Sequence, residues 1–221
     1  MAVGVFPALA LAFSLWAALD PARGGLAVLL AALAVLAGGF SWLEGGTTSA
    51  RDVTLVAAVG GLAAAGRVLF AAVPDVQPVT VTVAAAGVAL GPRRGFAVGA
   101  IAALVSNFFL GQGVHTPWQM LAWGGCGVLA GLLRPMLRRR AAFAAFCLVL
   151  GFAFGVLMDV WEWFTFYPHT WAALATILGQ GVSFNIAHAT GNVILAVAVG
   201  PELRRVLERH ERRSRTEVAW V

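Results

Sequence analysis

The chain contains no lysine, and charged residues of either sign are scarce. Of its 221 residues, 60% are hydrophobic and only 11% are charged, and all 15 basic residues are arginine. Soluble domains are about 25% charged and about 45–50% apolar, so this shortage excludes an ordinary soluble domain and indicates an integral membrane protein. The net charge of +5 does not favour nucleic-acid binding, because the arginines lie in short loops and in the tail, where they set membrane orientation.

Cysteine is also rare, and no metal-ligand spacing is present. Cys126 and Cys147 lie inside apolar runs, which is typical of packed small residues. No two histidines have a spacing that suits a metal, so we expect neither a metal site nor a cofactor. The N-terminus lacks the basic region and cleavage site of a secretory signal, so Met1 onward is expected to remain as an uncleaved span.

What the chain does have is long apolar segments. They predict an all-α polytopic membrane helical bundle of about eight spans, because about 20 helical residues cross a bilayer core. The segments cover residues 4–19, 25–43, 53–73, 78–91, 96–111, 117–134, 141–163 and 172–200. The alternation at the start of the fourth segment, Val79-Thr-Val-Thr-Val, taken alone suits a strand or a buried half-helix equally well.

The arginines favour a crossing at every segment. If all eight span, every arginine except Arg23 and Arg67 falls on one side, and removing the fourth segment would place Arg93 and Arg94 on the wrong side. The positive-inside rule then predicts that both termini are cytoplasmic, in the cell membrane of a bacterium.

Polar residues are distributed unevenly along the chain. The first two segments carry almost none, so we interpret residues 1–45 as an N-terminal transmembrane hairpin. Residues 46–205 are expected to form a six-helix substrate-binding membrane core, and residues 206–221 a basic cytoplasmic tail.

The richest polar stretch is Ser106 to Gln119, at the junction of two apolar segments. Unpaired polar groups in hydrocarbon cost several kcal/mol, so such a cluster is typical of a ligand site or of a satisfied turn at the membrane surface. The other polar positions of the core also map to the outer half of the bundle, which predicts one outward-facing pocket. The candidate substrate-binding residues are Arg67, Gln77, Asn107, Gln112, Thr116, Trp118, Gln119, Trp123, Asp159, Glu162, Asn185 and His188.

Several of these residues have a structural alternative. Arg67, Asp159 and Glu162 are expected either to pair, with Arg67 bridging to one of the carboxylates, or to face a hydrated cavity; the structural alternative is an ion pair that only stabilises the fold. Trp118 and Trp123 would stack on a planar ligand or would only pack. His188 belongs to an inward-pointing polar stripe with Asn185 and Asn192, in which it would serve the ligand or join two helices.

Small residues recur every four positions on the first core segment. Ala57, Gly61 and Ala65 form one stripe, and Gly60 and Ala64 form another beside it. Such stripes allow helix backbones to approach closely, either within the chain or against a partner.

Three stretches resemble the substrate-binding S components of energy-coupling factor (ECF) transporters, the vitamin-uptake branch of the ABC transporters. They are Gly66 to Thr80, Gly87 to Gly99 and Ser106 to Gln119, and the resemblance covers about residues 50–200. The likeness is to a branch of S components that are mostly unassigned and are sometimes linked with cobalamin-type or related vitamins, and it leaves the substrate open.

The resemblance implies a transport function. An S component binds a vitamin or its precursor from outside, using outer helix ends and a loop that here is Ala72–Val79. It docks on a transmembrane T subunit through small residues, here Ala57, Gly61 and Ala65, and two cytoplasmic ATPases drive its toppling in the lipid bilayer. The chain has no Walker A sequence, so these partners would hydrolyse the ATP. The N-terminal hairpin is an addition to the family's pattern and would cover part of the docking surface.

Two other functions fit the composition. One is an intramembrane serine hydrolase that uses Ser106 or Ser183 with His188, although neither serine has the glycine setting that such a nucleophile needs. The other is a structural membrane subunit that binds no ligand.

Overall fold

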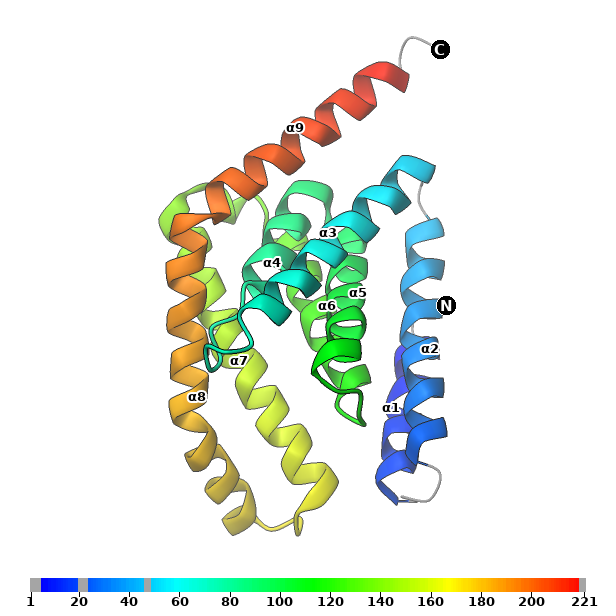
Figure 1. Ribbon diagram of the computed structural model, residues 1–221, viewed down its shortest axis with the longest axis vertical. Helices are drawn as coiled ribbons and strands as arrows, with labels where there is room; N and C mark the ends of the chain where they lie inside the picture. The colour runs from blue at the N-terminus through cyan, green and yellow to red at the C-terminus, as the bar shows by residue number, and fades with distance from the viewer. Residues whose placement is uncertain (1–4, 20–23, 46–48, 219–221) are drawn as a thin grey trace.

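The computed structural model describes residues 5–19, 24–45 and 49–218, and all regular elements in this part of the chain are helical. This confirms the all-α prediction. In chain order the elements are α1 (Val5–Leu19), α2 (Gly24–Glu44), α3 (Ala50–Leu69), α4 (Val79–Leu90), α5 (Pro92–Leu110), α6 (Thr116–Leu132), the short 3-10 helix η3 (Met136–Arg138), α7 (Arg140–Phe166), α8 (Trp171–Ala198) and α9 (Gly200–Val218) (Figure 1).

Four of the described helices, α3, α5, α7 and α8, are long and apolar enough to cross a membrane. α4 is different, because its 12 residues span only about 18 Å at 1.5 Å per residue. Its alternating valines and threonines do not form a strand. Nearly every residue of α4 is buried, so the helix lies inside the protein, where lipid thickness does not set its length.

Close glycine contacts bring α4, α5 and α6 together. A Cβ atom at Gly127 of α6 would collide with the carbonyl group of Gly95 on α5, and one at Gly87 of α4 would collide with the carbonyl group of Gly127. Such contacts need residues without side chains, because only then do helix backbones approach this closely. The turn between α4 and α5 uses Gly91 at a φ of +93°, followed by Pro92 in the first turn of α5.

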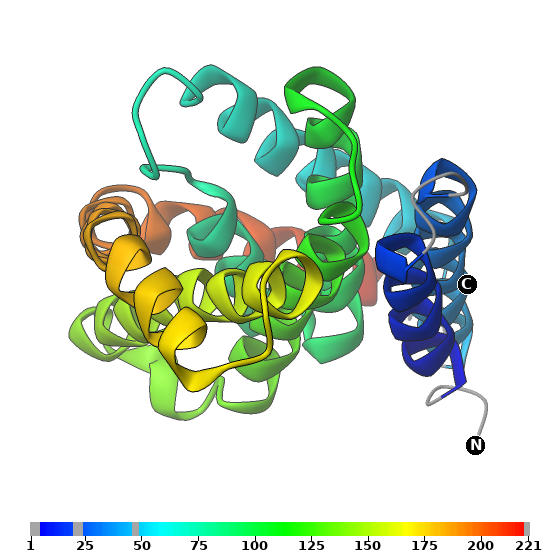
Figure 2. The same ribbon diagram turned by 90° about the horizontal axis from the view of Figure 1, so that it is seen from below.

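The remaining helices flank this centre. The α1–α2 hairpin lies on one side, next to α5, and the α7–α8 hairpin lies on the other (Figures 1 and 2). α9 lies at the end of the molecule opposite the α7–α8 turn (Figure 1). There Arg94 joins Asp52 to Glu211, and Arg204 donates to the backbone oxygen of Leu137. Helix ends that carry many of the arginines are therefore gathered at the α9 end.

The expected basic tail is part of a regular helix. α9 begins at Gly200, so the boundary expected at residue 205 falls inside a continuous element. Leu207 is buried against the core and Leu203 packs beside it. The apolar face of α9 thus covers the end of α4.

Candidate functional site

A cavity of about 540 Å³ opens between the α3–α4 connection, the start of α6 and the halves of α7 and α8 near their shared turn. Cavities of roughly 300–1,000 Å³ suit small-molecule ligands. The predicted site residues that line it are Arg67, Gln77, Gln119, Trp123, Asp159, Glu162, Asn185 and His188.

Arg67 is the charged centre of the α3 wall. Its side chain is only 8% exposed, and Nη1 donates to Ser106 Oγ at 2.7 Å and to the side-chain oxygen of Asn107. Nε donates to Gln77 Oε1 at 3.1 Å. Nη2 makes no hydrogen bond to another described residue, so this nitrogen is the donor left for a ligand in the cavity.

Polar side chains of α5, α6 and their connection form a second layer, which lies behind Arg67 as seen from the cavity. Asn107 Nδ2 donates to Thr116 Oγ1 at 3.0 Å and to Gln119 Oε1 at 2.9 Å, and Thr116 donates to Gln112 Oε1 at 2.8 Å. Asn107 and Thr116 are almost completely buried. These amides and hydroxyls satisfy one another, so they fix the position of the guanidinium group and of Gln119.

Of the two alternatives for Arg67, Asp159 and Glu162, the structure has all three lining one cavity and does not pair them among the described residues. Arg67 uses its hydrogen bonds on Gln77, Ser106 and Asn107, and no ion pair to Asp159 or Glu162 is present among the described residues. Because all three side chains line one cavity, positive charge lies on the α3 wall and negative charge on the α7 wall.

Where the α7 and α8 walls of the cavity meet, glycine residues leave space for polar side chains. Asn185 Nδ2 donates to Asp159 Oδ2 at 2.7 Å. A Cβ atom at Gly155 would collide with the Asn185 amide, and one at Gly181 would collide with the Asp159 carboxylate. The two glycines therefore allow the Asn185–Asp159 contact to form in the cavity wall.

His188 belongs to a chain of hydrogen bonds across the bundle. Its Nδ1 lies 2.7 Å from the backbone oxygen of Asp75, which only accepts, so Nδ1 carries the proton. Nε2 lies 3.3 Å from Thr80 Oγ1, and Thr80 accepts from Trp123 Nε1 at 3.2 Å. These contacts tie the α3–α4 connection and α4 to α8.

The aromatic residues around the cavity differ in how far they are exposed to it. Trp123 stacks on Phe154 at 4.4 Å between ring centroids, and the Arg67 guanidinium carbon lies 4.9 Å over the same ring. With 1% of its surface exposed, Trp123 forms the floor of the cavity and has no open face for stacking. Trp161 and Phe184 line the cavity and are more accessible, so a flat ligand would meet these rings instead.

Some predicted residues lie outside the cavity lining: Asn107, Gln112, Thr116 and Trp118. The first three belong to the layer behind Arg67, and Gln112 also donates to the backbone oxygen of Leu104. The indole nitrogen of Trp118 is buried and has no hydrogen-bond partner among the described residues.

Other residues line the cavity although they were not among the candidates: Asp75, His115, Phe154, Gly155, Met158, Trp161, Ile177, Gln180, Gly181 and Phe184. Asp75, His115 and Gln180 are polar, which is the property by which the candidates were chosen, so the sequence could have identified them. The apolar members have no such signal, because apolar residues are ordinary in a membrane helix.

Two titratable groups of the lining lie in connections between helices. Burial raises the pKa of Asp75, and the nearby His188 partly opposes this shift. Burial lowers the pKa of His115; a hydrogen bond to the Gly111 backbone acts in the opposite direction, and the positive charge of Arg67 adds to the lowering. Both shifts favour the neutral forms.

The residues proposed for hydrolysis are not brought together. Ser106 accepts from Arg67 and donates to the Ala103 backbone oxygen, and Ser183 is exposed on α8. Both nitrogens of His188 are occupied by Thr80 and Asp75. In the part of the chain that the structure describes, no group of three His, Cys, Asp or Glu side chains is placed to hold a metal ion.

One comparison with known proteins gives a match. A family model described as the S component of an ECF-type riboflavin transporter matches residues 48–205, which is most of the chain. No curated protein and no solved structure matches significantly.

Proposed function

Because the chain belongs to the family of S components of ECF-type riboflavin transporters, we propose that it captures a vitamin or related micronutrient in the cavity beside Arg67. This family consists of transporter components and not of enzymes. The captured molecule would be delivered inward with a T subunit and two ATPase subunits.

The observation that carries the proposal is the buried Arg67 side chain at the cavity wall, held by a fully bonded polar layer. Burying a charge is costly unless its hydrogen bonds are met, so a preorganised guanidinium whose two Nη2 N–H donors are not used by described residues is suited to a ligand. The carboxylates of Asp159 and Glu162 on the opposite wall would accept from donors of the same molecule.

These features favour a flat heterocycle with acceptors on one edge and donors on another. Trp161 and Phe184 supply aromatic surface for its ring. Riboflavin is the first ligand to test, since it has such a ring and appears in the description of the matching family. A cavity of about 540 Å³ suits a molecule of this kind better than a corrinoid, which is several times larger.

We also propose an orientation and a docking surface. The arginines at the α9 end support a cytoplasmic position for this end, and the cavity would then face the exterior. Ala57 and Ala65 are exposed on α3, and a Cβ atom at Gly61 would meet nothing within 4 Å. This open stripe is the surface that we assign to the T subunit.

The experiment has two arms. Small molecules extracted from the detergent-purified protein are identified by mass spectrometry, and the emptied protein is titrated with riboflavin by fluorescence quenching. We expect one bound heterocyclic vitamin per chain and weaker binding in Gln119→Ala. Ser183→Ala serves as the matched control, because Ser183 is exposed and lies outside the cavity lining. A folded protein that retains no vitamin and binds none from a vitamin panel would favour the ligand-free structural subunit.

A further inference from the structure

A second cavity lies at the other end of the molecule, between the start of α3 and the middle of α9. Its volume is about 570 Å³, similar to that of the vitamin cavity. Arg51 lines it from α3, and His210 and Arg213 line it from α9. Among the described residues of the lining, the ionisable side chains are all basic.

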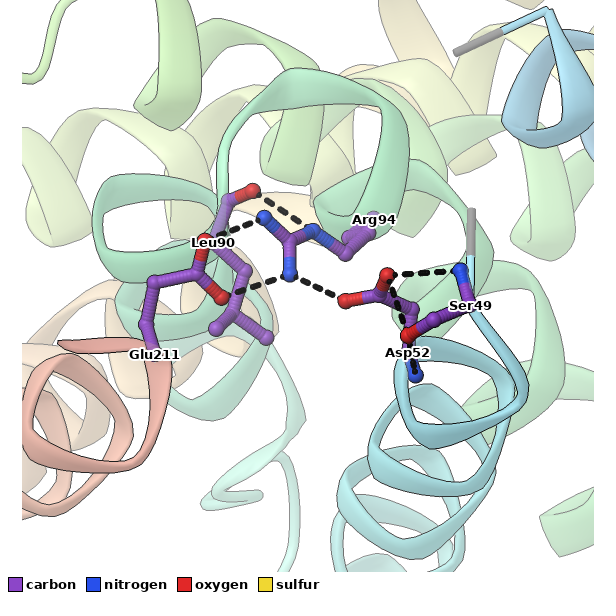
Figure 3. A network of polar contacts seen from close by, with 5 residues as sticks. All are labelled: Ser49, Asp52, Leu90, Arg94 and Glu211. Atoms are coloured by element: carbon purple, nitrogen blue, oxygen red, sulfur yellow. Dashed lines mark hydrogen bonds and ion pairs between the residues drawn. The ribbon is translucent and has the colours of Figure 1, made fainter. Parts of the chain in front are cut away.

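A set of ion pairs holds the two helices in this position (Figure 3). Arg94 of α5 donates to both carboxylate oxygens of Glu211 on α9, at 2.7 and 2.8 Å, and to Asp52 Oδ1 on α3 at 2.7 Å. Asp52 also accepts from the backbone and hydroxyl of Ser49, which caps α3. Arg94 therefore fixes α9 beside the first turn of α3, and the neighbours of Asp52 and Glu211 in sequence form the basic lining.

Apart from Thr54, whose hydroxyl donates to the Ala50 backbone oxygen, the rest of the cavity wall is apolar and leads along α3. Leu55 and Ala58 line it, and Leu62 follows one turn later on the same face with 58% of its surface exposed. Residues four apart on a helix lie about 6 Å apart along its axis, so the basic group of Arg51 and the apolar side chains that follow it extend over the dimensions of a single lipid. Basic pockets between membrane helices at the cytoplasmic surface are suited to anionic headgroups.

We propose that this cavity binds the phosphate group of an anionic membrane phospholipid, with Arg51 and Arg213 as the charged contacts and the Leu55–Leu62 face of α3 against an acyl chain. The basic lining recognises a phosphate, and the apolar wall favours a lipid over a soluble phosphate. The proposal does not depend on which vitamin the protein carries.

The test uses the full chain in a neutral detergent, titrated with phosphatidylglycerol, with phosphatidylcholine or with inorganic phosphate. Binding is followed by native mass spectrometry and by the shift in melting temperature. The double variant Arg51→Gln/Arg213→Gln removes both contacts. Its matched control, Arg139→Gln/Arg209→Gln, removes the same charge at exposed positions outside the cavity.

We expect phosphatidylglycerol to bind and stabilise the native chain and the control, and to bind about tenfold or more weakly to the cavity variant, since each basic group near a membrane surface contributes about one kcal/mol. Equal losses in the two double variants would show general charge attraction and overturn the site. If inorganic phosphate stabilised the native chain as much as phosphatidylglycerol does, and lost this effect in Arg51→Gln/Arg213→Gln, the anion site would be supported. Its assignment to a lipid would be overturned.

A second variant keeps the proposal testable if the double variant does not fold. Glu211→Gln makes the chain more positive but weakens the contact of α9 with Arg94. General attraction predicts stronger phosphatidylglycerol binding, whereas an organised cavity predicts weaker binding. Stronger phosphatidylglycerol binding by Glu211→Gln would overturn the proposal. The proposal would also be overturned if Arg51→Gln/Arg213→Gln lost assembly with the T subunit while its lipid binding stayed unchanged, because the basic groups would then serve a protein partner.

Discussion

At the scale of single residues, Arg67 shows how a charge is accommodated inside a membrane bundle. Its partners Ser106 and Asn107 come from α5 and Gln77 from the α3–α4 connection, so three segments meet on one guanidinium. From the sequence, Arg67 was expected to pair with a carboxylate or to face a hydrated cavity, and its neutral partners could not be foreseen. Because these partners are neutral, the full positive charge of Arg67 remains in the cavity wall. Arg67 is therefore the first residue to substitute.

The first prediction concerns Arg67→Gln. The variant loses a charge-assisted hydrogen bond to the ligand, which contributes about 1.5–3 kcal/mol, so affinity should fall about tenfold to a hundredfold. Arg67→Lys keeps the charge but not the forked geometry and should recover only part of the loss. Isothermal titration with the extracted vitamin measures both. Unchanged affinity in a folded Arg67→Gln protein would remove Arg67 from the site.

The second prediction is a dependence of stability on pH at Asp75. Burial raises its pKa in the folded protein, so the unfolded chain releases this proton at lower pH. The stability contributed by this side chain is present below the ordinary pKa of about 3.9 and is lost as the pH rises through the raised folded value. Asp75→Asn should therefore melt at a higher temperature than the wild type at about pH 8 and at nearly the same temperature at about pH 4.

Ligand-free protein and scanning fluorimetry are suited to this measurement. Glu44→Gln, at an exposed carboxyl near the end of α2, is the control for removing one negative charge. A gain for Asp75→Asn that is equal at both pH values would indicate a packing effect and contradict the prediction.

At the scale of elements, α3 has two small-residue stripes with different surroundings. Gly60 and Ala64 are buried, and a Cβ atom at Gly60 would come within 2.7 Å of the Ile101 side chain. Gly61 has open space, and Ala57 and Ala65 are exposed. The sequence pattern is the same for both stripes, so only their packing separates an internal contact from an available surface.

The third prediction uses this difference. Gly61→Leu should leave the melting temperature and vitamin affinity unchanged and prevent assembly with the T subunit, because the added side chain blocks close helix approach. Gly60→Leu is the paired variant and should destabilise the isolated chain by about 1–3 kcal/mol, through overpacking. Co-purification of the T subunit and ATPases measures assembly. A normal complex with Gly61→Leu would reject this face of α3.

At the scale of the whole molecule, the N-terminal hairpin lies beside the core and not over the vitamin cavity. α2 packs along α5, and a narrow apolar groove between α2, α3 and α5 is lined by residues that include Val35, Leu43 and Ala57. The hairpin thus approaches the docking stripe at Ala57, whereas Gly61 and Ala65 do not line this groove.

The fourth prediction follows from this arrangement. A chain of residues 46–221 should bind the extracted vitamin within about twofold of the full chain, because distant sites contribute independently. Fluorescence titration of both proteins in the same detergent provides the comparison. Loss of binding by a truncated protein that keeps its helical circular dichroism would show that the hairpin supports the site.

The sequence by itself determined the helical class, the approximate helix limits and the end of the core at which polar residues collect. These properties follow from hydropathy and charge along the chain, which are local quantities. Only the tertiary structure decided that α4 is enclosed by protein, that Trp123 is covered by Phe154 and Arg67, and that Asn107 lies behind Gln119. Each of these depends on contacts between segments far apart in the sequence, and the polarity of a residue does not indicate whether its partner is a ligand or another side chain.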